Sequence, residues 1–148
     1  MEMEKFYYFG YASNMHKTTL DSRLKFKAEK IAVGVLPHFG FRFNYLNQDG
    51  SARANIIASQ NESVYGVIYE ISGENFDHFL TSEPGYDFVK KEIFIKNGKI
   101  EAYTFLSTKI EKAIFPKEDY WKTIILGGKE NGLPNGYLAQ IINRVGKV

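Results

Sequence analysis

The sequence contains no cysteine, which excludes disulfide bonds, thiolate metal sites and cysteine nucleophiles. Its three histidines, His16, His38 and His78, are scattered without the spacing of converging ligands, so no metal site is expected. A glycine-rich phosphate loop is also missing, because the segment Gly127-Gly128-Lys129 has neither the earlier glycine nor the following Ser or Thr. These absences exclude chemistry that depends on thiols, on metal ions or on such a loop.

Long apolar runs and net charge are scarce as well. No apolar stretch approaches the roughly 20 residues that a membrane-spanning helix requires, and the acidic segment Met1–Lys5 does not resemble a signal peptide. The net charge of +2 is too small to indicate a nucleic acid or a membrane as partner. We therefore expect a soluble cytoplasmic protein, with residues 1–148 forming one domain.

Aromatic side chains are abundant, at 16% of the chain, and they favour β-strands because bulky rings fit a pleated surface. Turn signals separate the apolar runs at Pro37-His38, at Asn47–Gly50 and at Asn61-Glu62. The pattern predicts strands over Phe6–Phe9, Ile31–Leu36, Phe39–Leu46, Ala52–Ala58 and Val64–Ile71, and a hairpin of Tyr86–Ile95 with Lys99–Leu106 around Asn97-Gly98.

Helical patterns occur mainly between and after these strands. Ser72 is suited to cap a helix over residues 73–82, and Pro84-Gly85 ends it. A second helix is expected from about Pro116 to Gly127-Gly128, and a third from about Pro134; residues 16–24 form a loop or a short helix. The sequence therefore predicts an α+β fold, a small and mostly antiparallel β-barrel with short appended helices.

The first predicted strand ends abruptly in the small polar residues Ala12, Ser13 and Asn14. A tight loop of this kind can direct consecutive backbone N–H groups toward one anion. Ser13 and His16 do not form the nucleophile and base of a hydrolase elbow, because the serine lacks flanking glycines. We expect this loop to act mainly through its backbone.

Glu83 lies where an apolar helix meets a strand. A carboxylate held against aromatic rings is suited to proton transfer near neutral pH, whereas a solvated glutamate at a helix end is the more common situation. The sequence leaves both interpretations open. Aromatic residues interleaved with Lys27, Arg42 and Arg53 leave a nucleic-acid-binding barrel as a further alternative, against which the balanced charge argues.

Three segments together resemble the γ-glutamylcyclotransferase (AIG2-like) family. Tyr8–Met15 is similar to the family signature Tyr-Phe-x-Tyr-Gly-Ser-Asn-Leu/Met. Glu83-Pro84-Gly85 with Tyr86 resembles the Glu-Gly region that follows a helix in the family. The third segment, Lys129–Pro134, is similar to a Lys-Glu-Asn-Gly-Leu-Pro stretch near the C-terminus of the animal enzymes.

The resemblance implies an enzyme of acyltransferase or lyase type that needs no cofactor. In the family, the substrate's own α-amine attacks its γ-carbonyl, which releases 5-oxoproline and an amine or amino acid. Glu83 would be the general acid/base glutamate, and the loop amides would stabilise the oxyanion or hold the α-carboxylate. The substrate-binding residues would be Tyr8, Phe9, Gly10, Tyr11, Ala12, Ser13 and Asn14, together with Tyr103 from a neighbouring strand.

The chain departs from the family pattern at two positions. Ala12 replaces the usual loop glycine, so its Cβ narrows the pocket or changes the loop, and Pro84 is inserted between Glu83 and Gly85. A non-catalytic small-molecule binding protein on the same fold is therefore the alternative function. The sequence does not identify the leaving group, and aromatic side chains that stayed exposed would favour a homodimer.

Overall fold

Five strands close into a barrel in the order β1-β3-β2-β4-β5 in a computed structural model that describes residues 4–146. All pairs are antiparallel except β1 with β5, where Tyr8 lies opposite Tyr103 in a parallel pair that closes the barrel. The predicted antiparallel barrel with short helices is confirmed. The strands are β1 Lys5–Gly10, β2 Glu29–Leu46, β3 Ala52–Ser72, β4 Asp87–Ile95 and β5 Gly98–Leu106.

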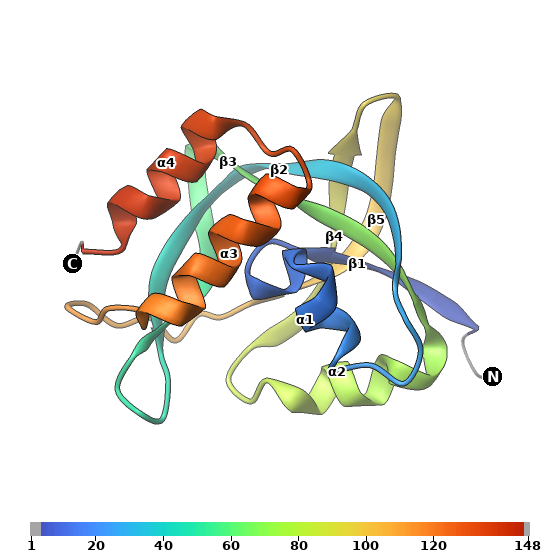
Figure 1. Ribbon diagram of the computed structural model, residues 1–148, viewed down its shortest axis with the longest axis horizontal. Coiled ribbons are helices and arrows are strands. Elements are labelled where there is room, and N and C mark those ends of the chain that lie inside the picture. Colours follow the sequence, from blue (N-terminus) through green and yellow to red (C-terminus); the bar gives the residue numbers. More distant parts are fainter. Residues whose placement is uncertain (1–3, 147–148) are drawn as a thin grey trace.

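The helices lie around this barrel (Figure 1). The α3 helix packs on the short turn after β1, α4 packs on α3 and β2, and α2 packs on β4. The 3₁₀ turns are η1 Ser13–Met15 and η2 Gly73–Asn75, and the helices are α1 Lys17–Asp21, α2 Phe76–Ser82, α3 Glu118–Glu130 and α4 Asn135–Arg144. Among residues 4–146, no helix combines the length and apolar character that crossing a bilayer requires. Residues 1–3, within the segment compared with a signal peptide, lie outside the described part.

The two turns predicted at Pro37-His38 and Asn61-Glu62 are wrong, because β2 and β3 each run on as one long strand. Pro37 pairs with Ser63 and Phe39 with Ala58, so residues 59–62 of β3 lie opposite His38 alone. His38 has a φ of 66°, and the pair of strands bulges there without separating. A proline, which lacks an N–H donor, is tolerated at such a bulge. Pro37-His38 therefore marks a bulge in the strand and not a turn that reverses the chain.

The α3 helix also runs beyond its predicted end at Gly127-Gly128, and it stops at Glu130. A Cβ on Gly127 would lie 2.5 Å from the backbone nitrogen of His16, so glycine here allows α3 to pack closely on the loop after β1. The chain leaves the helix at Gly132, whose φ of 71° suits glycine. The other predicted elements are confirmed, including the Ser72 hydroxyl that accepts from the Glu74 N–H.

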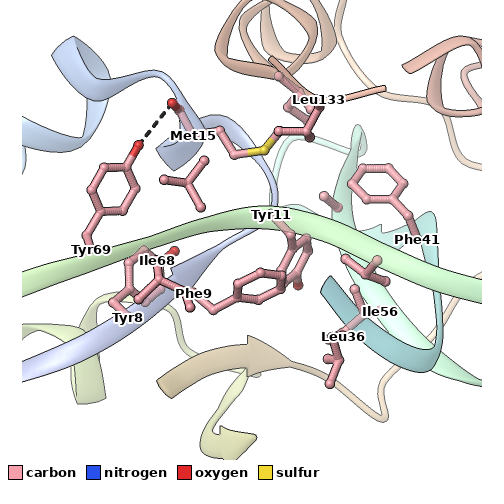
Figure 2. Close-up of a cluster of buried hydrophobic side chains, with 14 of the residues drawn as sticks. Tyr8, Phe9, Tyr11, Met15, Leu36, Phe41, Ile56, Ile68, Tyr69 and Leu133 are labelled. Atoms are coloured by element: carbon pink, nitrogen blue, oxygen red, sulfur yellow. Dashed lines mark hydrogen bonds between the residues drawn. The ribbon is translucent and has the colours of Figure 1, made fainter. Parts of the chain in front are cut away.

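The core holds the loop that follows β1. Phe9 and Met15 are fully buried with Ile68 and Tyr69 of β3 (Figure 2). The Tyr69 hydroxyl donates a hydrogen bond of 3.0 Å to the Met15 carbonyl oxygen, and the Asn131 side chain donates to the same oxygen at 2.9 Å. The loop is therefore held from the barrel on one side and from the end of α3 on the other.

Candidate active site

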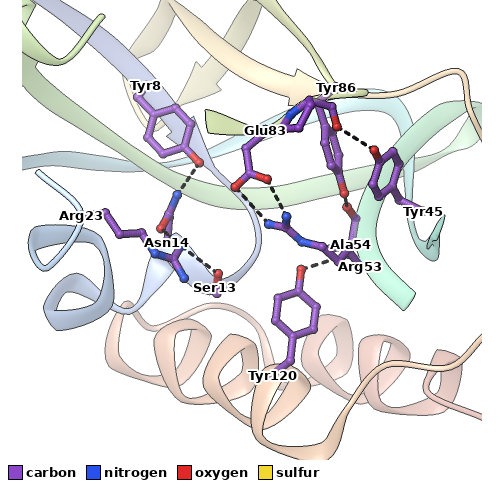
Figure 3. A network of polar contacts seen from close by, with 11 residues as sticks. Tyr8, Ser13, Asn14, Arg23, Tyr45, Arg53, Ala54, Glu83, Tyr86 and Tyr120 are labelled. Atoms are coloured by element: carbon purple, nitrogen blue, oxygen red, sulfur yellow. Dashed lines mark hydrogen bonds and ion pairs between the residues drawn. The ribbon is translucent and has the colours of Figure 1, made fainter. Parts of the chain in front are cut away.

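A small cavity lies where β1 ends. Its walls come from β1, the following loop, β3, the α2–β4 connection, β5 and α3. Figure 3 shows the polar side chains that face one another there. The lining residues are Tyr8, Tyr11, Ala12, Ser13, Asn14, Arg23, Arg53, Ala54, Glu83, Tyr86, Phe105 and Tyr120.

The loop after β1 forms a single 3₁₀ turn. Its first hydrogen bond runs from the Met15 N–H to the Ala12 carbonyl at 3.0 Å, so the N–H groups of Ser13 and Asn14 have no partner within the turn. Ala12 has a φ of −125°, a negative value that an L-residue adopts. Alanine therefore replaces glycine here without a left-handed backbone.

A chain of hydrogen bonds crosses one wall of the cavity. The Asn14 side-chain amide donates to the Tyr8 hydroxyl at 3.0 Å, and its oxygen accepts from Arg23 at 2.6 Å. Burial raises the pKa of Tyr8 to about 12, so its hydroxyl stays protonated at neutral pH. Because that oxygen already accepts from Asn14, its own proton is available for a ligand.

Glu83 is ion-paired. Both Glu83 carboxylate oxygens accept from the Arg53 guanidinium, at 2.5 and 3.1 Å, in a forked pair (Figure 3). The side chains of Glu83 and Arg53 are 23% and 28% exposed, so the pair is partly withdrawn from water. The expectation of a carboxylate held only by aromatic rings is therefore corrected, and so is the alternative of a freely solvated glutamate.

Two tyrosines fix the strand that carries Arg53. The Tyr86 hydroxyl donates to the Ala54 carbonyl at 2.6 Å, and the Ala54 N–H donates to the Tyr120 hydroxyl at 3.0 Å. The Arg53 guanidinium also lies 5.7 Å from the centre of the Tyr86 ring, a favourable cation–π distance. Burial raises the pKa of both tyrosines, so these hydroxyls remain protonated.

The structure brings together six of the nine residues named from the sequence, namely Tyr8, Tyr11, Ala12, Ser13, Asn14 and Glu83. The other three, Phe9, Gly10 and Tyr103, do not line the cavity. Phe9 points to the opposite side of β1 from Tyr8, because side chains alternate along a strand. A Cβ on Gly10 would lie 3.2 Å from the Tyr8 ring, so this glycine makes room for that side chain.

Tyr103, which the resemblance implies contacts substrate, is not among the residues that line the cavity. Its ring stacks on Phe88 at 5.0 Å and meets Phe76 edge-on at 5.2 Å, beneath η2 and α2. Phe105, two residues further along the same face of β5, is the residue that reaches the cavity.

Sequence reasoning missed six residues that line the cavity: Arg23, Arg53, Ala54, Tyr86, Phe105 and Tyr120. Arg53 was noted only as a possible nucleic-acid contact, and Tyr86 only as the residue after the Glu83 segment. These residues lie close to the recognised segments only in the folded protein. Their proximity depends on strand register, which spacing along the sequence does not reveal. Within residues 4–146, no three His, Asp or Glu side chains gather as metal ligands.

The comparisons with known proteins agree on one family. The sequence model of the AIG2-like family matches residues 63–141. Gamma-glutamylcyclotransferase of Mus musculus is 31% identical over 147 residues, which cover 92% of this chain and 77% of the mouse protein. The Homo sapiens protein of the same name is 28% identical over 148 residues, with coverage of 90% and 76%.

A solved structure agrees with the sequence comparisons. A gamma-glutamyl cyclotransferase superimposes with a TM-score of 0.84 at 28% identity, covering 94% of this chain and 87% of that one. This chain belongs to the AIG2-like, γ-glutamylcyclotransferase family.

Proposed function

We propose that this protein is a γ-glutamyl cyclotransferase that converts a γ-glutamyl amide into 5-oxoproline and a free amine or amino acid. The observation that carries the proposal is that the Glu83 carboxylate and the loop Ala12–Asn14 line the same cavity. The relatives named gamma-glutamylcyclotransferase support the same reaction.

The reaction needs no nucleophile from the protein. The substrate supplies both the attacking α-amine and the γ-carbonyl carbon, so the cavity has to hold the glutamyl chain curled and move protons. Holding two reacting groups together in this way raises their effective concentration. A cavity with a carboxylate, free backbone amides and protonated tyrosines, all described above, is suited to that task.

Glu83 acts as base and then as acid. It accepts a proton from the α-ammonium group, and the neutral amine forms a C–N bond to the γ-carbonyl carbon. Glu83 then returns this proton to the leaving nitrogen while the original amide C–N bond breaks, and it takes the second proton from the attacking nitrogen and passes it to the departing amine, which leaves as an ammonium ion. Arg53 keeps the carboxylate directed into the cavity through the forked pair.

The negative charge that develops on the γ-carbonyl oxygen needs donors. The N–H groups of Ser13 and Asn14 precede the first bonded N–H of the turn, and the Tyr8 hydroxyl retains a proton for donation. Fixed donors that meet a developing oxyanion contribute strongly to rate, since they need not reorganise during the reaction. We assign the oxyanion to this wall of the cavity.

Two observations favour catalysis over the binding-only alternative. Glu83 lines the cavity, where it can reach a bound ligand. Ala12 has a negative φ, so the departure from glycine does not require a different loop.

The test is a measurement of 5-oxoproline release from a panel of γ-glutamyl amino acids, peptides and amines. We expect turnover of at least one class, and loss of turnover in Glu83→Gln with the fold retained, as monitored by circular dichroism. Unchanged turnover in that folded variant would exclude Glu83 as acid/base, and absence of turnover for every compound would leave the binding-only function.

A further inference from the structure

We infer that Arg53 binds the α-carboxylate of the substrate while Glu83 receives its α-ammonium group. This inference rests on the proposed function and adds to it the residue that selects the amino-acid head of the substrate. It assigns Arg53, which the cavity places beside Glu83, a role in direct substrate binding as well as in positioning the carboxylate.

The guanidinium has capacity for a second anion. It carries five N–H bonds, and the forked pair with Glu83 uses two of them. The remaining N–H groups can donate to a substrate carboxylate without breaking the pair. Arg53 lines the cavity on β3, and Tyr86 lies against its guanidinium at 5.7 Å from the ring centre, so its orientation is fixed before a ligand arrives.

The pair is complementary to an α-amino acid. In such a molecule the ammonium and carboxylate groups are attached to one carbon, so their receptors must be neighbours of opposite charge. Glu83 and Arg53 are neighbours of this kind, and both are partly withdrawn from water. Each charge of the ligand therefore meets an opposite charge in a site where electrostatic interactions are stronger than in bulk water.

The other positive side chain of the cavity is less suited to this role. Arg23 is exposed, and its Nη1 is already committed to Asn14 at 2.6 Å and to Ser13 at 3.4 Å. It lies with the wall that we assign to the γ-carbonyl oxygen. With the carboxylate on Arg53, the amides of Ser13 and Asn14 stay free for that oxygen.

The experiment compares paired ligands that differ only at the α-carboxylate. For turnover, the pair is γ-glutamyl-L-alanine and the analogue whose glutamyl α-carboxylate is a carboxamide. For binding by calorimetry, the pair is L-glutamine and its α-carboxamide. We expect the wild type to prefer each carboxylate by about 10- to 100-fold, which is the usual effect of hydrogen bonds to a charged group.

In Arg53→Met this preference should fall close to one, even if the overall rate also falls because Glu83 is less well held. Arg53→Lys, which keeps the charge but loses the fork, should retain part of the preference. Arg144→Met is the matched control, since it also removes an arginine paired with a glutamate, Glu62, at a site outside the cavity. It should keep the full preference.

An unchanged preference in Arg53→Met, or no preference in the wild type, would overturn the inference, because a purely positioning role for Arg53 would affect both ligands equally. If Arg53→Met does not fold, an unchanged preference in Arg53→Lys overturns it instead. A wild type that turns over no γ-glutamyl compound but binds L-glutamine with an Arg53-dependent preference would refute the proposed function and leave the inference standing.

Discussion

Arg42 holds Glu62 in a forked ion pair with distances of 2.9 and 2.7 Å, outside the cavity. The pair lies at the bulge between β2 and β3, and Ser59 donates a further hydrogen bond to the same carboxylate. This pair has the same forked arrangement as Arg53 with Glu83, but we propose no substrate binding beside it. The protein therefore contains its own control for a forked arginine–glutamate pair.

Replacing Glu83 by glutamine should lower kcat/KM for 5-oxoproline release by about 100-fold or more, since the amide cannot exchange the proton. Glu62→Gln breaks the equivalent pair outside the cavity and should leave kcat/KM per folded molecule within a few fold of the wild type. Both variants should be measured with circular dichroism and urea unfolding alongside. Equal losses in the two variants would indicate that ion-pair stability, and not proton transfer, limits the activity.

Ala12→Gly restores the residue found in the family signature. Because Ala12 has a negative φ of −125°, the native loop does not use the left-handed backbone that glycine favours. We expect kcat/KM to change by no more than a few fold and the free energy of unfolding to fall by about 0.5–1 kcal/mol, from the greater entropy of the unfolded chain. A tenfold gain in activity would show instead that the alanine methyl obstructs the substrate.

Gly127→Ala should destabilise the protein despite the better helix propensity of alanine. The added Cβ would lie 2.5 Å from the His16 nitrogen and 2.7 Å from the Met15 carbonyl carbon, so backbone must move. We expect a net loss of roughly 1–3 kcal/mol in urea unfolding. Gly136→Ala in α4 is the control: a Cβ there meets nothing within 4 Å, so stability should rise by about 0.5–1 kcal/mol.

The Glu62 pair should also shape the acid stability of the protein. The hydrogen bonds from Arg42, with a smaller contribution from Ser59, lower the pKa of Glu62 from 4.5 to about 2. A lowered folded-state pKa stabilises the protein above the unfolded value, and this contribution is lost as the pH falls from 4.5 toward 2. The free energy of unfolding of Glu62→Gln should therefore fall less steeply than that of the wild type over this range. Parallel curves would show that the pair does not contribute.

The parts of the fold that depend on local chemistry could be predicted from the sequence. The β4–β5 hairpin forms around Asn97-Gly98 and η2 is capped by Ser72, because these residues act on backbone only a few positions away. The effect of Pro37-His38 could not be predicted from neighbouring residues in the same way. Whether such a signal makes a turn or a bulge depends on the partner strand, which here continues past it.

The residues of the candidate site also differ in whether local sequence patterns reveal them. Tyr8, Ser13 and Glu83 could be found because they lie in segments with recognisable patterns. Arg53 lies 30 residues from Glu83, and their contact depends on the barrel register and on the connection after α2. No spacing rule predicts that contact. For the same reason, the sequence could not show that Tyr103 lies outside the cavity, since this depends on how β5 pairs with β1.

The hydrogen bond from Asn131 to the Met15 carbonyl joins residues 116 positions apart, so the loop after β1 depends on a part of the chain that is synthesised long after it. At 5–20 residues per second, the interval is on the order of ten seconds. During that time a nascent chain can form the early strands without the support that α3 gives to the loop. The loop should therefore gain this support only after Asn131 has been synthesised.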